Sequence, residues 1–138
     1  MAVELADEIK GLVDRANFAH LATIMPDGSP LATPVWVGRE GDRILVATGD
    51  GSLKARNASR DPRVALSIVD FDDPYSEAQI RGRVVERRPD GDFAAMDRIS
   101  RKYTGAEFPF RNPAGRIVLV IEVDKARYAK LPFKHTPA

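Results

Sequence analysis

The chain has 138 residues, of which 43% are hydrophobic and 30% charged, a balance typical of one globular domain with a buried core. Its 21 lysines and arginines against 20 acidic residues give a net charge of +1, without the basic excess of a general nucleic-acid binder. The absence of cysteine excludes disulfides, thiolate catalysis and cysteine-ligated zinc, and the two distant histidines, His20 and His135, argue against a histidine metal site.

Charged residues interrupt the apolar positions of the first 15 residues, MAVELADEIKGLVDR, so this segment is neither a signal peptide nor a membrane span. We therefore expect one domain over residues 1–138, cytoplasmic, with no membrane or nucleic-acid partner. Apolar residues at helical spacing predict a first helix over Val3–Ala16.

A series of short segments rich in β-forming residues follows this helix, with turns at Pro26–Ser29 and Arg39–Asp42. The six predicted strands cover Phe18–Met25, Pro30–Gly38, Arg43–Thr48, Arg63–Phe71, Glu77–Arg88 and a final segment from Arg116 onward. Gly82, inside the fifth strand, indicates a bulge or the close approach of another backbone.

A second amphipathic helix is predicted within Pro89–Gly105, where Asp90 or Asp92 can cap its first turn. Because the strands occur at hairpin spacing and do not alternate with regular crossover helices, a doubly wound sheet is a poor fit. The pattern favours a mostly β fold with α additions, a six-stranded antiparallel barrel.

The stretch ATGDGSLKARN, between the third and fourth strands, interrupts the β pattern. Ser52 is a candidate N-cap, and Leu53 and Lys54 would then lie in the first helical turn, where free N–H groups and the helix dipole attract anions. Thr48 and Asn57 are placed to complete a cradle for one phosphate. The alternative is an ordinary solvated helix face with turn glycines, and the spacing matches neither a P-loop nor a dinucleotide fingerprint.

Three segments, FAHLATIMPDGSPLATPVWV, ILVATGDGSLKARNASRDPRVALSI and IRGRVVE, resemble the flavin- and deazaflavin-binding split β-barrel superfamily of pyridoxamine-phosphate oxidase. The most specific part is the T-x-x-x-S-x-K-x-x-N pattern of Thr48, Ser52, Lys54 and Asn57, followed by D-P-R-V-A-L. The likeness covers roughly Phe18–Tyr128 and is greatest to the actinobacterial branch that uses the deazaflavin coenzyme F420.

The resemblance implies a split barrel that forms a homodimer with two cofactor sites at the interface, and transfer of a hydride to an unsaturated organic acceptor. It places the cofactor phosphate at Thr48, Ser52 and Lys54, and Asn57 in support of that loop. The ring would lie against one strand, and Arg81 is a weaker correspondence. The predicted cofactor-binding residues are Thr33, Pro34, Val35, Trp36, Thr48, Ser52, Leu53, Lys54, Asn57 and Arg81.

FMN is the alternative cofactor. FMN-using relatives place an arginine before the phosphate lysine, where this chain has Leu53, and their strand R-x-V-L-L-K reads RILVAT here. These departures favour the deazaflavin. A carrier that binds deazaflavin without turnover, and a structural dimer with no cofactor, are the further alternatives.

The sequence singles out no catalytic acid, since nothing selects one among His20, Tyr75, Tyr103 and Tyr128. A hydride carrier performs the difficult step itself, so the protein has only to bind, orient and exclude water. Trp36 either stacks near the cofactor or anchors the core. The loop Glu107–Arg116 either covers the site, holding an anionic tail through its arginines, or is purely structural.

Overall fold

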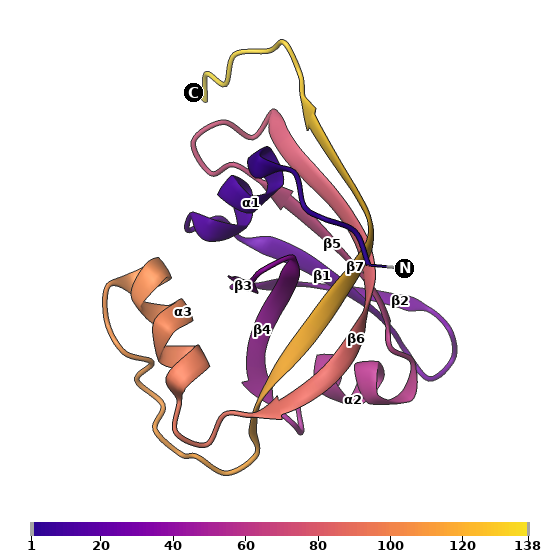
Figure 1. Ribbon diagram of the computed structural model, residues 1–138, viewed down its shortest axis with the longest axis vertical. Helices are drawn as coiled ribbons and strands as arrows, with labels where there is room; N and C mark the ends of the chain where they lie inside the picture. Colours follow the sequence, from indigo (N-terminus) through magenta and orange to yellow (C-terminus); the bar gives the residue numbers. More distant parts are fainter. Residues whose placement is uncertain (1, 138) are drawn as a thin grey trace.

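Seven antiparallel strands form one curled sheet, with three helices placed around it, in a computed structural model that describes residues 2–137 (Figure 1). The strands are β1 (Ala19–Ile24), β2 (Pro30–Val35), β3 (Gly38–Glu40), β4 (Arg43–Gly49), β5 (Arg63–Val69), β6 (Ser76–Pro89) and β7 (Arg116–Lys130). The helices are α1 (Asp7–Asp14), α2 (Leu53–Arg60) and α3 (Ala94–Thr104). Within these residues, no helix is long and apolar enough to cross a membrane.

The order of the strands explains why the sheet curls. Neighbouring strands follow the order β2-β1-β5-β6-β7-β4-β3, so β2 and β3 are the two edges. Only Trp36 and Val37 separate the end of β2 from the start of β3. The two edges are thus joined by a two-residue link, and the sheet has to bend round until they meet, which gives a barrel with a seam at this link.

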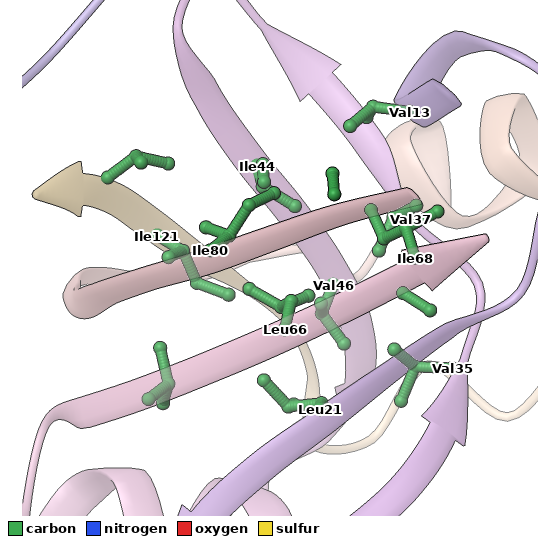
Figure 2. Packing of buried hydrophobic residues seen from close by; sticks show 14 of the residues in the cluster. Val13, Leu21, Val35, Val37, Ile44, Val46, Leu66, Ile68, Ile80 and Ile121 are labelled. Carbon is green, nitrogen blue, oxygen red and sulfur yellow. The ribbon is translucent and has the colours of Figure 1, made fainter. Parts of the chain in front are cut away.

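Aliphatic side chains from the concave face of the sheet and from α1 fill the barrel. Figure 2 shows Val35, Val37 and Val46 pointing into the same interior as residues of β5, β6 and β7. The largest fully buried aliphatic side chains include Leu12, Leu21, Ile44, Ile68, Ile80, Leu119 and Ile121. Each is expected to contribute about 1.5–3 kcal/mol through burial of apolar surface.

The predicted number of six strands is wrong, because the structure has seven. The segment predicted as one strand over Pro30–Gly38 bends at the seam, where β2 stops pairing with β1 and β3 starts pairing with β4. Glu40 pairs with Arg43, so the predicted turn at Arg39–Asp42 narrows to two residues, with Gly41 at a φ of 62°. Alternating hydrophobicity looks the same for one strand and for two strands that pair with different neighbours.

The first helix is shorter than predicted, because its N-terminal residues pair elsewhere. The backbone N–H of Val3 donates to the carbonyl of Val123 (2.9 Å), and that of Leu5 donates to the carboxylate of Asp42 (3.0 Å). Helix α1 therefore begins at Asp7. Helix α3 lies within its predicted range, and Asp90 accepts hydrogen bonds from two backbone N–H groups of its first turn, both at 3.0 Å.

Gly82 lies at an irregularity of the β6–β7 pairing, between Arg81 and Gly82, as its place in the sequence indicated. A Cβ added at this glycine would lie 2.2 Å from the carbonyl oxygen of Glu122. The two backbones therefore approach so closely here that only glycine fits.

Candidate functional site

A cavity of about 370 Å³ lies at the seam, between the end of β2, the second half of β4, the start of α2 and helix α3. Pro34, Val35 and Trp36 line it from β2 and the link, and Val46 to Thr48 line it from β4. The cavity is mostly apolar, and Lys54 and Arg116 are its two cationic residues. This combination is typical of a small-molecule site, where apolar walls bind the body of a ligand and a few polar groups fix its orientation.

The start of helix α2 forms the polar corner of this cavity. Ser52 caps the helix, because its hydroxyl oxygen accepts a hydrogen bond from the N–H of Ala55 (3.3 Å), as predicted. The same oxygen accepts a hydrogen bond from the hydroxyl of Thr48 (3.0 Å). Ser52 therefore holds the end of β4 against the helix start, next to the residues that line the cavity.

Lys54 is the cation nearest this corner in sequence. Among the residues that the structure describes, no carboxylate forms an ion pair with it. Burial lowers the pKa of its ammonium below the usual value, and the positive charge of Arg116 lowers this pKa further. A half-buried cation next to a second cation, both without an acidic partner, is a site that an anion would stabilise.

Arg116, the first residue of β7, is that second cation. Among the described residues its buried Nε has no hydrogen-bond partner, whereas its guanidinium contacts the sulfur of Met96 (3.2 Å) and lies over the ring of Phe108 (5.2 Å to the centroid). Arg116 pairs with Gly49 across β4 and β7, which places it beside Thr48. A buried N–H without an acceptor costs free energy, so this group too calls for an anionic ligand.

The apolar wall of the cavity includes Trp36, whose ring stacks on that of Tyr103. The ring centroids are 5.2 Å apart, and the angle between the ring planes is 7°. Trp36 therefore belongs both to the cavity wall and to the packing between the link and α3. Phe18 also lines the cavity, and its ring lies 5.8 Å from that of Tyr103, centroid to centroid.

The loop Glu107–Arg116 reaches the cavity through Phe108 and Arg116, which both line it. Its other arginine is engaged elsewhere, because Arg111 donates a hydrogen bond to the carboxylate of Asp97 (2.7 Å) and lies over the ring of Phe93. The loop thus contributes two residues to the cavity wall, and Arg111 holds it to α3. That it covers the site and binds an anionic tail stays a prediction.

Of the ten predicted cofactor-binding residues, five line this cavity: Pro34, Val35, Trp36, Thr48 and Lys54. Ser52 organises the corner without lining it, and Leu53 points outward. Thr33 lies outside the cavity lining, with a buried hydroxyl that has no partner.

Asn57 is completely buried, and its bonds hold α2 in place; its support of the phosphate loop stays a prediction. Its side-chain amide donates to the hydroxyl of Thr23 (3.1 Å) and accepts from the guanidinium of Arg60 (2.9 Å). These bonds tie α2 to the hairpin of β1 and β2, so within one chain Asn57 does not reach the cavity.

Arg81 lies elsewhere, on the lining of a larger, open cavity of about 1010 Å³ formed mainly by residues of β1, β5, β6 and β7. Within one chain the structure does not bring Arg81 to the seam cavity. His20, also on this second cavity, and the other candidate acids Tyr75 and Tyr128 are absent from the seam cavity lining.

Sequence reasoning missed Arg116 as a partner of Lys54, along with the apolar residues Val46, Met96 and Ile99. The only sequence signal for Arg116 was its place at the end of the loop Glu107–Arg116. No group of three or more acidic or histidine residues that could hold a metal ion occurs within residues 2–137.

Comparisons with known proteins show the family to which this fold belongs. The family model described as pyridoxamine 5'-phosphate oxidase matches residues 5–130. A solved structure named F420 reductase is similar to this chain, with a TM-score of 0.80 and 29% identity over 86% of this chain and 94% of its own. A conserved hypothetical protein of Mycobacterium tuberculosis has a TM-score of 0.71 and 26% identity, over 99% of this chain and 94% of its own.

The General Stress Protein 26 of Bacillus anthracis shares the fold at 15% identity, with a TM-score of 0.70 over 89% of this chain and 92% of its own. No curated protein matches the sequence. The curled sheet thus has the split-barrel fold of flavin-type oxidoreductases. The chain belongs to the pyridoxamine 5'-phosphate oxidase family, and its relatives include an F420 reductase.

Proposed function

We propose that this protein is a reductase that uses the deazaflavin coenzyme F420, and that the seam cavity holds the cofactor. The observation that carries the proposal is a pair of cations, Lys54 and Arg116, in a mostly apolar cavity, neither with an acidic partner among residues 2–137. A phosphorylated molecule with a planar ring matches both ends of such a cavity. The likeness to an F420 reductase supports the choice of cofactor.

The proposal assigns a part to each of five residues of the cavity. Lys54 and Arg116 bind the phosphate, with the free N–H groups at the start of α2 beside them. Trp36 and Pro34 form the wall against which the ring lies, and Phe108 restricts access of water from the loop side. When bound, the reduced cofactor supplies a hydride. The proton that completes reduction of the acceptor comes from solvent.

FMN is the second candidate cofactor, because the family model is that of an FMN-type oxidase and a phosphate site does not by itself distinguish the two. Leu53 favours the deazaflavin, since it stands where FMN-using relatives have an arginine. It is exposed and outside the cavity lining, so it brings no second positive charge to the corner.

Side-by-side fluorescence titrations of the purified protein with coenzyme F420 and with FMN test the cofactor. Tighter binding of F420 is expected, and its oxidation in the presence of enones or quinones would show turnover. Tighter binding of FMN would replace the first candidate by the second. Binding of F420 without turnover would identify a carrier, and binding of neither would reject the proposal.

We also propose that the protein is a homodimer and that the open cavity containing Arg81 faces the second copy. Arg81 lies directly opposite Lys125 across β6 and β7, and like charges in such a pair are destabilising unless an opposite charge approaches. Neither forms an ion pair among the described residues. In this proposal Arg81 contributes to the cofactor site of the partner.

The lack of cysteine fits the cytoplasmic location that we also propose.

Sedimentation equilibrium is expected to give twice the mass of the 15.2 kDa chain. Arg81→Glu should change the dissociation constant of the dimer or its affinity for F420, whereas Arg98→Glu, an exposed control on α3, should leave both unchanged. A monomer at micromolar concentration with unchanged F420 affinity in the Arg81 variant would contradict this arrangement.

A further inference from the structure

The last turn of α3 holds the two-residue link that joins the edges of the sheet. The ammonium of Lys102 donates hydrogen bonds to the carbonyl of Val13, at the end of α1 (2.7 Å), and to the carbonyl of Val37 in the link. The next residue, Tyr103, accepts a hydrogen bond from the N–H of Val37 (3.1 Å) and donates one to the carbonyl of Asn17 (2.6 Å).

Both backbone polar groups of Val37 are therefore bound by adjacent side chains of α3. Val37 lies between β2 and β3 and has no place in the pairing of either strand. Because it is also completely buried, its N–H and C=O would be left without partners if these side chains were absent. The position of the link thus depends on Lys102 and Tyr103.

The residue next to Val37 is Trp36, which lines the seam cavity. The ring of Tyr103 stacks on the ring of Trp36, and the ammonium of Lys102 lies 4.8 Å from the centroid of the Tyr103 ring. Neither Lys102 nor Tyr103 lines the cavity. They contact its wall from behind, through the link and through the stacked ring.

We propose that Lys102 and Tyr103 are positioning residues: they fix the link and the plane of the Trp36 ring, and so set the shape of the cavity wall that receives a ligand. Their effect on cofactor affinity rests on the function proposed above. Their effect on Trp36 does not depend on it.

The charges around Lys102 make this arrangement sensitive to pH. Burial lowers the pKa of Lys102 to about 8, although the charge of Asp14 on α1 opposes this. The other groups on this side are Lys10 on α1, Arg39 on β3, which binds Asp14, and Tyr103 itself. Asp14 stays ionised because the hydrogen bond from Arg39 lowers its pKa, and burial raises the pKa of Tyr103 above 10.

From pH 7 to pH 9, Lys102 thus loses its proton while Asp14 remains charged and Tyr103 neutral. Hydrogen bonds from a neutral amine to the two carbonyls are weaker than those from an ammonium. The link and Trp36 should therefore be held less firmly above pH 8.

Trp36 is the only tryptophan of the chain, so its fluorescence reports this position directly. In the unmodified protein without cofactor, its emission is expected to shift, and its quenching by acrylamide to increase, with a midpoint near pH 8. Lys102→Met should give the high-pH signal throughout this range. Lys102→Arg keeps its charge, so its signal should not change with pH. Lys134→Met, an exposed control near the C-terminus, should titrate like the unmodified protein.

Tyr103→Phe keeps a ring for the stack but loses both hydrogen bonds, and it should also increase the quenching of Trp36. A Trp36 signal in Lys102→Met and Tyr103→Phe identical to that of the unmodified protein, with normal circular dichroism, would overturn the proposal. A pH transition that persists in Lys102→Arg would overturn its assignment to Lys102.

Titration with F420 then adds a second readout. Affinity is expected to fall on the order of tenfold in Lys102→Met. Position 102 does not touch the ligand, but its substitution displaces the cavity wall and so weakens the contacts between this wall and the ligand. If the unmodified protein does not bind F420, the function proposed above fails, and the fluorescence results still decide the role of Lys102 and Tyr103. If Trp36 responds as expected but F420 affinity is unchanged, the wall does not contribute to binding.

Discussion

Lys54→Ala is expected to weaken the binding of coenzyme F420 about tenfold to a hundredfold, since a hydrogen bond to a charged group is worth roughly 1.5–3 kcal/mol. The ammonium of Lys54 has no acidic partner among the described residues, and burial already disfavours its charged form. A bound phosphate would relieve that cost. Fluorescence titration of the variant measures the change.

Arg56→Ala is the matched control, because Arg56 is an exposed cation of the same helix that does not line the cavity. It should leave the dissociation constant within about twofold, as expected for a screened surface charge. Arg116→Ala should weaken binding as Lys54→Ala does, and the double variant tests whether both cations bind one phosphate. Full affinity in Lys54→Ala would remove the phosphate from this corner.

Gly82→Ala is expected to lower the free energy of unfolding by about 3 kcal/mol or more, because overpacking against atoms that cannot move is costly. The new methyl group would lie 2.2 Å from the carbonyl oxygen of Glu122 and 3.1 Å from its carbonyl carbon. Both are backbone atoms of β7, so relief requires the two longest strands to separate locally. Urea unfolding measures the loss.

Gly91→Ala serves as the comparison, since a Cβ at Gly91 meets nothing within 4 Å. Its unfolding midpoint should lie close to that of the unmodified protein, within about 0.5 kcal/mol in free energy. Equal midpoints for the two alanine variants would mean that β6 and β7 can separate at the bulge without loss of stability.

Local features of the fold and site could be predicted from the sequence because short segments determine them. Ser52 as the N-cap of α2, the cap by Asp90, and the close backbone approach at Gly82 are examples, and the structure confirms all three. Strand β3 is the exception among the local features, because it could not be predicted as a separate strand. It differs from the end of β2 only in the strand with which it pairs.

Contacts between distant segments could not be predicted in this way. Arg116 reaches the cavity because β7 pairs with β4 in a register that sets it opposite Gly49, and no pattern within either segment reveals that register. Arg111, five residues earlier in the same loop and equally basic, pairs with Asp97 instead. Lys102 likewise has an ordinary place on an amphipathic helix, and only the tertiary structure brings it to the link.

The link of Trp36 and Val37 has a consequence for how ligand preference can change in this fold. Because only two residues span the distance between the edges of the sheet, the circumference of the barrel is fixed at the seam. The barrel cannot widen to admit a bulkier molecule unless residues are inserted into the link, and such an insertion would displace both edge strands. Relatives that bind different ligands are therefore expected to differ in the side chain at position 36 and in the loop 107–116, while the length of the link stays the same.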